Sequence, residues 1–382
     1  MSATKNKLKI AFVLDTTLDS EDGVQQYILV LGYYLKSLGH TVHYIAGETH
    51  RTDIDNLHSM AKSTNVRFNG NKVIYPLPAK IGPIKKLLEK EKFDILHVQV
   101  PYSPLFAAKV VKYAPKTTAI VGTFHIFPFN KVAYFGTKAL GLVLSKNLKN
   151  FHSHISVSKA NQFFAKKTFK INSLVIPNMV DTNLFKPAKN FRSDKSTEIL
   201  YLGRLTERKG CSYLINALSK LQQLDPTINF KLKIAGKGEL LSKLQNLVES
   251  LSLSDNIEFL GKVDNDQKVK LMQRADIAVF PSYAGESFGI VLIEAMAAQS
   301  GFVLAGDNVG YRTVLGEIPE SIVDVKNISA FSDKLYKILT DQKYRQNIFL
   351  KQQEIVKQYD INIVGKQVLN LYYDCLKLLN NK

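Results

Sequence analysis

The sequence predicts an α/β protein made of two domains of similar design, each a parallel sheet covered by helices. Three observations support this prediction. At 382 residues the chain has the length of two ordinary domains, and its 45% apolar content is ample for two cores. A strand, a glycine-bearing loop and a helix follow one another near residue 10 and again near residue 200, an order that opens a Rossmann-like unit.

The first domain is expected at residues 1–180. An apolar run predicts a buried parallel strand at 7–14, which residues 22–25 interrupt, and a helical pattern follows at 26–37. A second strand is predicted at 41–46. The remaining elements expected in this half are a lysine-bearing helix at 80–92, strands at 93–98, 118–123, 154–158 and 174–176, and an amphipathic helix at 131–149.

After a linker at 177–181, the same alternation restarts in a second domain expected at residues 181–359. A strand at 198–202 leads through a glycine-containing turn into a helix that ends near Leu224. A last helix is predicted at 363–379, beyond the completed second domain. The other elements expected here are strands at 231–235, 257–260 and 276–280, a helix that follows a loop and ends near Ala298, and short helices between them.

Charge is distributed unevenly along the chain. The net charge is +18, of which residues 1–180 supply +14 from 24 Lys and Arg against 10 Asp and Glu. Residues 95–180 hold 11 lysines, no arginine and no acid. Nucleic-acid surfaces usually include arginine for bidentate contacts, whereas lysines alone suit an anionic membrane surface. A lysine-rich genome would also raise the lysine count, but it does not explain the missing acids.

Several classes of protein are disfavoured by the sequence. The two cysteines, Cys211 and Cys375, have no redox or metal-site spacing, which fits a reducing cytosol. No apolar run has the length of a signal peptide or a spanning helix, so a membrane role is expected to be peripheral. There is no P-loop and no nucleophile elbow. Short acidic pairs at 53–55 and 264–266 are common in polar loops, and neither a metal nor another cofactor is expected.

The segment 284–295 (AGESFGIVLIEA) is the most informative stretch of the chain. Strand, glycine-bearing loop and helix together present backbone N–H groups and a positive helix end to an anion. The segment also carries two carboxylates, Glu286 in the loop and Glu294 in the helix. Carboxylates beside a phosphate site make sense as acceptors of hydrogen bonds from sugar hydroxyls.

Cations and a histidine are predicted at the same kind of strand edge. Arg204 and Lys209 flank a glycine turn and suit a diphosphate, whose oxygens gain charge as the bond to a sugar breaks. His125 follows the strand at 118–123, at the edge where such sheets bind ligands. His97 lies inside its strand and is expected to be a packed core residue.

These motifs resemble those of GT-B retaining glycosyltransferases of family four over the whole chain. The spacing of Glu286 and Glu294 matches the family's E-x7-E signature, and Gly203-Arg204 with Lys209-Gly210 matches as well. Within the family, the runs 122–125 and 285–298 resemble the phosphatidylinositol mannosyltransferases. The resemblance implies two Rossmann-like domains facing across a cleft, with residues 360–382 returning as a helix to the first, acceptor-side domain, and the second domain binding a nucleotide sugar.

The resemblance also implies residue roles. The transferred sugar and the diphosphate are expected at the catalytic residues His125, Glu286, Arg204 and Lys209. Further contacts to the donor are expected from Gly23, Gly203, Val263, Lys268, Ser287, Phe288, Gly289, Ile290 and Glu294, with Glu294 on the ribose. Gln25 is expected on the acceptor side. The family retains the anomeric configuration and needs no metal ion.

The sequence therefore predicts a cytosolic enzyme, peripheral at the inner membrane face, that moves a hexose to a lipid. GDP-mannose is the favoured donor because Val263 and Lys268 match, although Asn265 replaces an acidic residue that helps read guanine. The apolar run at 126–129 differs from the inositol-binding pattern, so the lipid stays open. The alternatives are a UDP-sugar enzyme with a soluble or polysaccharide acceptor, and a basic nucleic-acid-binding protein, which the absence of arginine disfavours.

Overall fold

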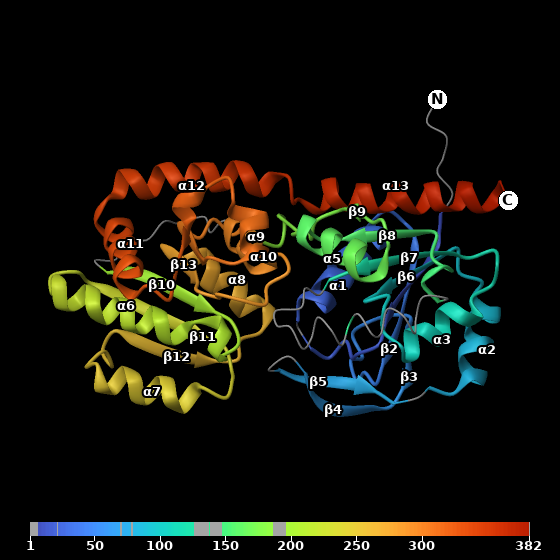
Figure 1. The fold of residues 1–382 in the computed structure, drawn as a ribbon, viewed down its shortest axis with the longest axis horizontal. Helices are drawn as coiled ribbons and strands as arrows, with labels where there is room; N and C mark the ends of the chain where they lie inside the picture. Colours follow the sequence, from blue (N-terminus) through green and yellow to red (C-terminus); the bar gives the residue numbers. More distant parts are fainter. Residues whose placement is uncertain are drawn as a thin grey trace. The chain divides into compact units, whose positions relative to one another are not determined.

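The computed structural model describes residues 7–20, 22–68, 71–77, 79–125, 137, 147–185 and 196–381. The chain divides into two compact units. Unit 1 is formed by Met1–Met179 and Ile361–Lys382, and unit 2 by Val180–Asp360. Each unit consists of a parallel sheet with helices on it (Figure 1). The predicted fold class, an α/β chain with two Rossmann-like halves, is confirmed.

Unit 1 is built on a seven-stranded parallel sheet with the order β3-β2-β1-β6-β7-β8-β9. The strand order reverses between β1 and β6, and this reversal makes a crevice at the carboxyl edge of the sheet. The strands are β1 (Lys9–Leu14), β2 (Thr41–Gly47), β3 (Leu57–Ala61), β6 (Ile95–Gln99), β7 (Ala119–Phe124), β8 (Ser153–Ser156) and β9 (Leu174–Val175). A separate antiparallel hairpin pairs β4 (Ser63–Phe68) with β5 (Asn71–Pro76).

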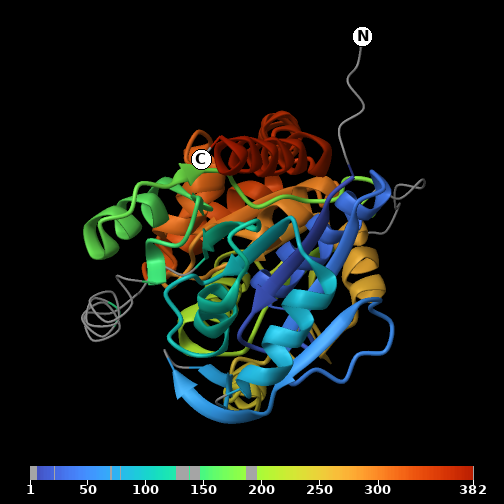
Figure 2. The same ribbon diagram turned by 90° about the vertical axis from the view of Figure 1, so that its right-hand side faces the viewer.

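The helices of unit 1 include one from the far end of the chain. α13 (Ile361–Asn380) packs beside α1 (Gly23–Ser37), where a Cβ on Gly365 would lie 2.6 Å from the Tyr34 ring. Figures 1 and 2 show α13 running along this unit. The remaining helices described here are α2 (Ile81–Glu91), α3 (Phe106–Tyr113) and α5 (Lys159–Phe169).

The start of α1 corrects one prediction. Residues 22–25 were expected to interrupt the chain before a helix at 26, but α1 begins at Gly23, with Asp22 in extended conformation before it. The interruption lies earlier, after β1 ends at Leu14. The Gln25 side chain explains the difference, because its amide donates to the carbonyl of Thr17 at 2.9 Å and holds the first turn against the loop.

Unit 2 is built on a six-stranded parallel sheet with the order β12-β11-β10-β13-β14-β15. In chain order this is 3-2-1-4-5-6, the dinucleotide-binding arrangement, with the reversal between β10 and β13. The strands are β10 (Thr197–Leu202), β11 (Phe230–Ala235), β12 (Ile257–Gly261), β13 (Ile277–Phe280), β14 (Phe302–Gly306) and β15 (Ile322–Val323).

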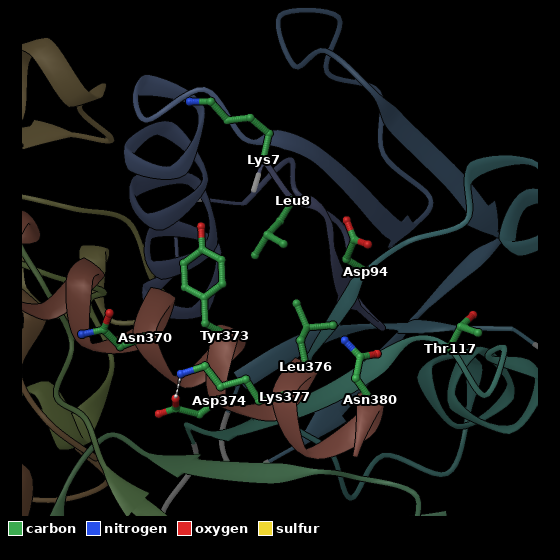
Figure 3. Close-up of a pocket in the computed structure, with 10 residues that line it drawn as sticks. All are labelled: Lys7, Leu8, Asp94, Thr117, Asn370, Tyr373, Asp374, Leu376, Lys377 and Asn380. Atoms are coloured by element: carbon green, nitrogen blue, oxygen red, sulfur yellow. Dashed lines mark ion pairs between the residues drawn. The ribbon is translucent and has the colours of Figure 1, made fainter. Parts of the chain in front are cut away.

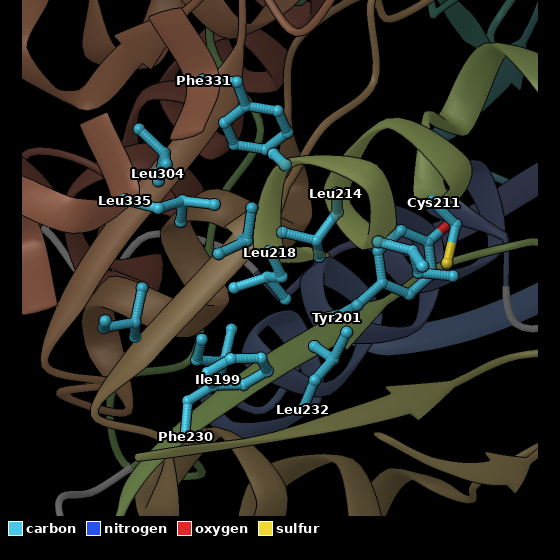
Figure 4. Close-up of a cluster of buried hydrophobic side chains, with 14 of the residues drawn as sticks. Ile199, Tyr201, Cys211, Leu214, Leu218, Phe230, Leu232, Leu304, Phe331 and Leu335 are labelled. Atoms are coloured by element: carbon cyan, nitrogen blue, oxygen red, sulfur yellow. The ribbon is translucent and has the colours of Figure 1, made fainter. Parts of the chain in front are cut away.

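Apolar side chains between the sheet and its helices form the core of unit 2. Ile199 and Leu232 from the strands meet Leu214 and Leu218 of α6, with Leu335 of α11 beside them (Figure 4). The helices of this unit are α6 (Cys211–Leu224), α7 (Leu241–Ser250), α8 (Asn265–Arg274), α9 (Ile290–Ala297), α10 (Val309–Leu315), α11 (Ile328–Thr340) and α12 (Gln342–Lys357).

The structure also tests the expectation for a membrane-spanning segment. Within the described residues, none of the helices has both the length and the apolar character needed to cross a bilayer. The predicted amphipathic helix at 131–149 lies outside the described residues except at 137 and 147–149.

Candidate functional site

Two loops meet at the reversal of strand order in unit 2. The loop 203–210 follows β10, and the loop 281–289 follows β13, which is the neighbour of β10 in the sheet. The connections from β10 and β13 leave toward opposite sides of the reversal, so the crevice between them is the place where such a sheet binds its ligand.

Glu286 is the centre of this loop pair. Its Oε1 accepts a hydrogen bond from Arg208 Nη1 at 2.8 Å and lies 2.8 Å from Lys209 Nζ. Ser282 Oγ donates to the same carboxylate at 2.8 Å. The Glu286 side chain is 15% exposed. The carboxylate is therefore fixed from three sides and still reaches the surface of the unit.

The cations decide the protonation state of Glu286. Burial alone would raise the pKa of its carboxyl, but the charges of Lys209 and Arg208 and the hydrogen bonds from Lys209 and Ser282 lower that pKa to about 2. Burial lowers the pKa of Lys209, and Glu286 opposes that shift. The carboxylate is ionised at neutral pH and can only accept hydrogen bonds.

Arg208 is a site residue that the sequence interpretation missed. It lies in the 3₁₀ turn Glu207–Lys209, and besides Glu286 it donates to the carbonyl of Ala284 at 3.2 Å. Its own carbonyl accepts from the backbone N–H of Tyr283 at 3.1 Å. Its position next to Lys209 in the sequence could have identified it, because a 3₁₀ turn can present neighbouring side chains to one partner.

Arg204 lies in the same loop and adds a positive charge to the site. Its carbonyl accepts from the Tyr201 hydroxyl at 3.1 Å, which anchors the turn that starts at Gly203. Its guanidinium helps to lower the pKa of Lys209, after the larger effects of burial, Glu286 and Arg208. Three cationic side chains thus surround this end of the sheet.

Two glycines shape the loop before α9. Gly285 has φ +74° and Gly289 has φ +123°, backbone conformations that side chains with a Cβ rarely adopt. A Cβ on Gly289 would lie 2.8 Å from the Tyr311 ring. Between them, Phe288 is buried and its ring packs edge-on against Tyr359. The loop ends at Ile290, where α9 begins, with Ser287 half-buried between Glu286 and Phe288.

Glu294 and Lys268 form the second ion pair of the site. Lys268 Nζ on α8 lies 2.7 Å from Glu294 Oε1 on α9, and both side chains are largely buried. The same ammonium lies 5.3 Å from the centre of the Phe185 ring. Val263, in the turn before α8, is half-buried. The structure therefore brings together two residues that are predicted to contact the donor and that lie 26 positions apart in the sequence.

His125 lies at the carboxyl edge of the sheet in unit 1, where the sequence predicts it. It is buried, its ring packs edge-on against Tyr27 with centroids 4.8 Å apart, and burial lowers its pKa to about 3. Its Nε2 lies 2.7 Å from Oε1 of Gln99, the last residue of β6. The apolar run that follows, at 126–129, is outside the described residues.

The contacts of Gln99 fix the tautomer of His125. The Gln99 amide nitrogen donates to the carbonyl of His97 at 3.2 Å, so the amide oxygen faces His125. An amide oxygen can only accept, so His125 Nε2 carries the proton and Nδ1 is the acceptor of the neutral ring. His97 itself is fully buried, 2.6 Å from both the Tyr372 and the Thr123 hydroxyls, which confirms its predicted place in the core.

Gln25 and Gly23 lie on the first turn of α1, near the same edge. Gln25 is buried, and its amide also lies 3.3 Å from the Thr16 hydroxyl. Gly23 is exposed at the helix start. Asp19, in the preceding loop, accepts from the backbone N–H of His50 at 2.9 Å, which ties the loop after β1 to the loop after β2.

A hollow of about 970 Å³ lies at the opposite edge of the unit 1 sheet (Figure 3). It is bordered by the residues that precede β1, β6 and β7 and by the end of α13, with Asp374 and Lys377 paired at 3.6 Å. Because it is at the amino ends of the strands, it is separate from the edge that carries His125.

Each acidic pair of the sequence includes a residue with a structural partner. Asp264 caps α8 through a 2.8 Å hydrogen bond from the backbone N–H of Gln267, and Asp53 pairs with Arg51. Among the residues described, no three His, Cys, Asp or Glu side chains are grouped so that they could hold a metal ion.

Comparisons with known proteins cover nearly the whole chain. The family model described as Glycosyltransferase Family 4 matches residues 22–184, and the one described as Glycosyl transferases group 1 matches residues 183–353. The phosphatidyl-myo-inositol mannosyltransferase of Mycolicibacterium smegmatis is 30% identical over 376 residues, which cover 96% of this chain and 93% of that protein. The chain belongs to glycosyltransferase family 4.

Solved structures share the GT-B fold of this family 4 glycosyltransferase. A glycosyltransferase from Rickettsia africae ESF-5 superimposes with a TM-score of 0.76 at 22% identity, over 98% of this chain and 100% of that one. Anabaena Alr3699/HepE in complex with UDP-glucose gives a TM-score of 0.74 at 18% identity, over 96% of this chain and 100% of that one. The resemblance seen in the sequence is confirmed at the level of family and fold.

Proposed function

We propose that this glycosyltransferase transfers a hexose from a nucleotide diphosphate sugar to a lipid acceptor at the cytosolic face of a membrane. The donor that we favour is GDP-mannose. The mannosyltransferase name of the relative that shares most of the chain supports the choice of mannose and of a lipid. The product would then be a glycolipid.

The arrangement around Glu286 is the observation that carries this proposal. A carboxylate ionised at neutral pH accepts hydrogen bonds from hydroxyls, and a sugar offers several on one face. The cations Arg204, Arg208 and Lys209 suit the negative charge that grows on a diphosphate when its bond to the sugar breaks. A site that pairs one acceptor with three cations at a Rossmann edge fits a sugar diphosphate better than a simple phosphate ester.

The rest of the donor is assigned to the neighbouring residues. Glu294, held by Lys268, accepts from the ribose hydroxyls, and Val263 contacts the base. The backbone N–H groups at the start of α9, around Gly289 and Ile290, face the phosphates. Gly203 lets the backbone approach the donor closely. We propose further that the anomeric configuration is retained and that no metal ion takes part, because the cations provide the charge.

Unit 1 is assigned to the acceptor and to the reacting sugar. His125, neutral with Nδ1 as its acceptor, would receive a hydrogen bond from a hydroxyl of the transferred sugar. Gln25 and Gly23 border the same edge, where the acceptor headgroup would lie. The excess of positive charge in residues 1–180 favours an anionic membrane surface as the partner.

Thermal unfolding with GDP, UDP and their mannose and glucose conjugates tests the donor. A ligand that binds only the folded enzyme raises the midpoint temperature of unfolding by mass action. GDP and GDP-mannose are therefore expected to give larger increases in this temperature than UDP and its conjugates. A larger shift with UDP would overturn the choice of GDP-mannose. Glu286→Ala is the matched control, because it should abolish transfer and the sugar-dependent part of the shift while the cooperative unfolding of the protein persists.

Product analysis tests the chemistry. Incubation with labelled GDP-mannose and extracted anionic lipids should give a labelled lipid whose sugar has the anomeric configuration of the donor, as read by NMR coupling. Activity should persist after EDTA treatment. Label that appears only in water-soluble products from a panel of sugars and polysaccharides would contradict a lipid acceptor.

A further inference from the structure

One face of α5 carries an unusual set of exposed side chains. Lysines and one phenylalanine recur at the spacing of a single helical face, and all of them are exposed. We call this set the α5 basic face: Lys159, Phe163, Lys166, Lys167 and Lys170. Lys170 closes the helix as its left-handed cap.

The opposite face of α5 fixes the helix to unit 1. Asn161, Phe164, Ala165 and Thr168 are buried, and Asn161 donates to the carbonyl of Phe124 at 3.4 Å. Ser158 caps the first turn by accepting from the N–H of Asn161. The helix is therefore held against the sheet by a complete inner face, and the α5 basic face is not needed for packing.

Phe163 is exposed although its chemistry favours burial. Its side chain is 64% exposed, while Phe164, the next residue, is 2% exposed in the core. The ammonium of Lys167 lies 5.6 Å from the centre of the Phe163 ring, at the outer rim of cation–π contact. An aromatic ring among lysines is the pattern of helices that lie in the headgroup region of a bilayer, with the ring at the acyl boundary and the ammonium groups among anionic headgroups.

The stretch of sequence that contains α5 carries charge of one sign. The helix lies inside residues 95–180, which contain 11 lysines and no acidic residue, so the sequence supplies no local carboxylate to neutralise it. The same stretch has no arginine, the residue that nucleic-acid surfaces use for bidentate contacts. Charge complementarity and the exposed ring together select an anionic lipid surface over a nucleic acid.

We propose that the α5 basic face docks this enzyme on an anionic lipid bilayer, with Phe163 inserted at the interface. The proposal deepens the proposed function and rests on its lipid acceptor. It assigns the membrane contact to residues that have no part in the donor site.

The absence of tryptophan from the chain allows a direct test. Phe163→Trp introduces a single tryptophan on the α5 basic face, whose emission can be excited apart from that of the tyrosines. Vesicles of phosphatidylcholine with phosphatidylglycerol should shift its emission to the blue, and brominated acyl chains should quench it, whereas phosphatidylcholine alone should do neither. Leu224→Trp is the matched control, since Leu224 on α6 of unit 2 is also 64% exposed, and its emission should not change.

Flotation with the same vesicles tests the lysines. Lys166→Gln with Lys167→Gln should reduce binding by about 25-fold, at roughly fivefold for each lysine near an anionic surface, and the loss should shrink at high salt. Lys112→Gln with Lys116→Gln removes the same charge from exposed positions of the same acid-free stretch and should reduce binding much less. Phe163→Ser should weaken binding by about tenfold without a change in charge.

Three results would overturn the proposal. The first is equal loss of binding in the two lysine pairs, which would mean that only total charge matters. The second is a Phe163→Trp emission that anionic vesicles leave unchanged. The third is tighter binding of duplex DNA than of vesicles, with the same dependence on Lys166 and Lys167. Donor hydrolysis in detergent separates this proposal from the proposed function, because the α5 variants should retain it and Glu286→Ala should not.

Discussion

Lys209 Nζ lies 2.8 Å from Glu286 Oε1, so the cation after β10 and the carboxylate after β13 form an ion pair between the two loops. Arg208 lies at the same distance from that oxygen. Removal of Glu286 would leave the Lys209 and Arg208 cations largely buried without the charge that compensates them.

Lys209→Ala should lower the rate of transfer by about 10²- to 10³-fold, the usual loss when one donor to a developing negative charge is removed. The rate constant kcat under saturating donor is the measurement. Lys243→Ala is the control, since Lys243 is an exposed lysine of α7 and the change in net charge is the same. An unchanged kcat in Lys209→Ala would remove Lys209 from the reaction.

Glu286→Gln should make the protein less sensitive to acid. The pKa of Glu286 is lowered from 4.5 to about 2 in the folded protein, so its ion pairs stabilise the fold above about pH 4.5 and lose that effect as the pH falls through about 2. The shift corresponds to about 3 kcal/mol. Between these pH values, the thermal midpoint of Glu286→Gln should fall less than that of the parent protein. Parallel curves for the two proteins would contradict the assigned pKa.

Gln99→Glu should alter the titration of His125. A carboxylate at 2.7 Å from Nε2 favours the imidazolium, so the pKa of His125 should rise from about 3 toward the ordinary range. The acid limb of the pH–rate profile should move upward with it. Long-range ¹H–¹⁵N correlation spectra should show the Nε2–H tautomer in the parent. A spectrum of the Nδ1–H tautomer would refute the contact scheme.

Gly289→Ala should destabilise unit 2 more than Gly261→Ala does. Both glycines have positive φ, which costs an alanine about 1 kcal/mol, but a Cβ at Gly261 meets nothing within 4 Å. A Cβ at Gly289 would meet Tyr311 and Leu292 at 2.8 and 2.9 Å, so an additional loss of about 1–3 kcal/mol is expected. Urea unfolding of the two variants measures the difference. Equal losses would show that the loop relaxes freely.

Much of the fold follows from local sequence patterns. Apolar runs at 7–14 and 198–202 predict β1 and β10 within two residues of their observed starts, because a buried parallel strand needs a continuous apolar run. The last helix, predicted at 363–379, is observed as Ile361–Asn380. The strands β3, β4, β5, β14 and β15 were not predicted. The edge strand β3 and the hairpin β4–β5 depend on pairing partners rather than on their own apolar content, whereas β14 is a buried apolar run that the sequence interpretation missed.

The residues of the candidate site also differ in how far the sequence alone could identify them. The sequence by itself determined the Glu286 loop, the helix with Glu294 and the cation turn, because glycines, carboxylates and a following helical pattern are local signals. Tertiary structure decided the partners. Arg208 meets Glu286 across 78 positions, and Tyr372 reaches His97 across 275. Such contacts depend on which strands lie side by side and on which helix returns to which sheet. Together with burial, the contacts of each side chain then keep Glu286 ionised and hold His125 in one tautomer.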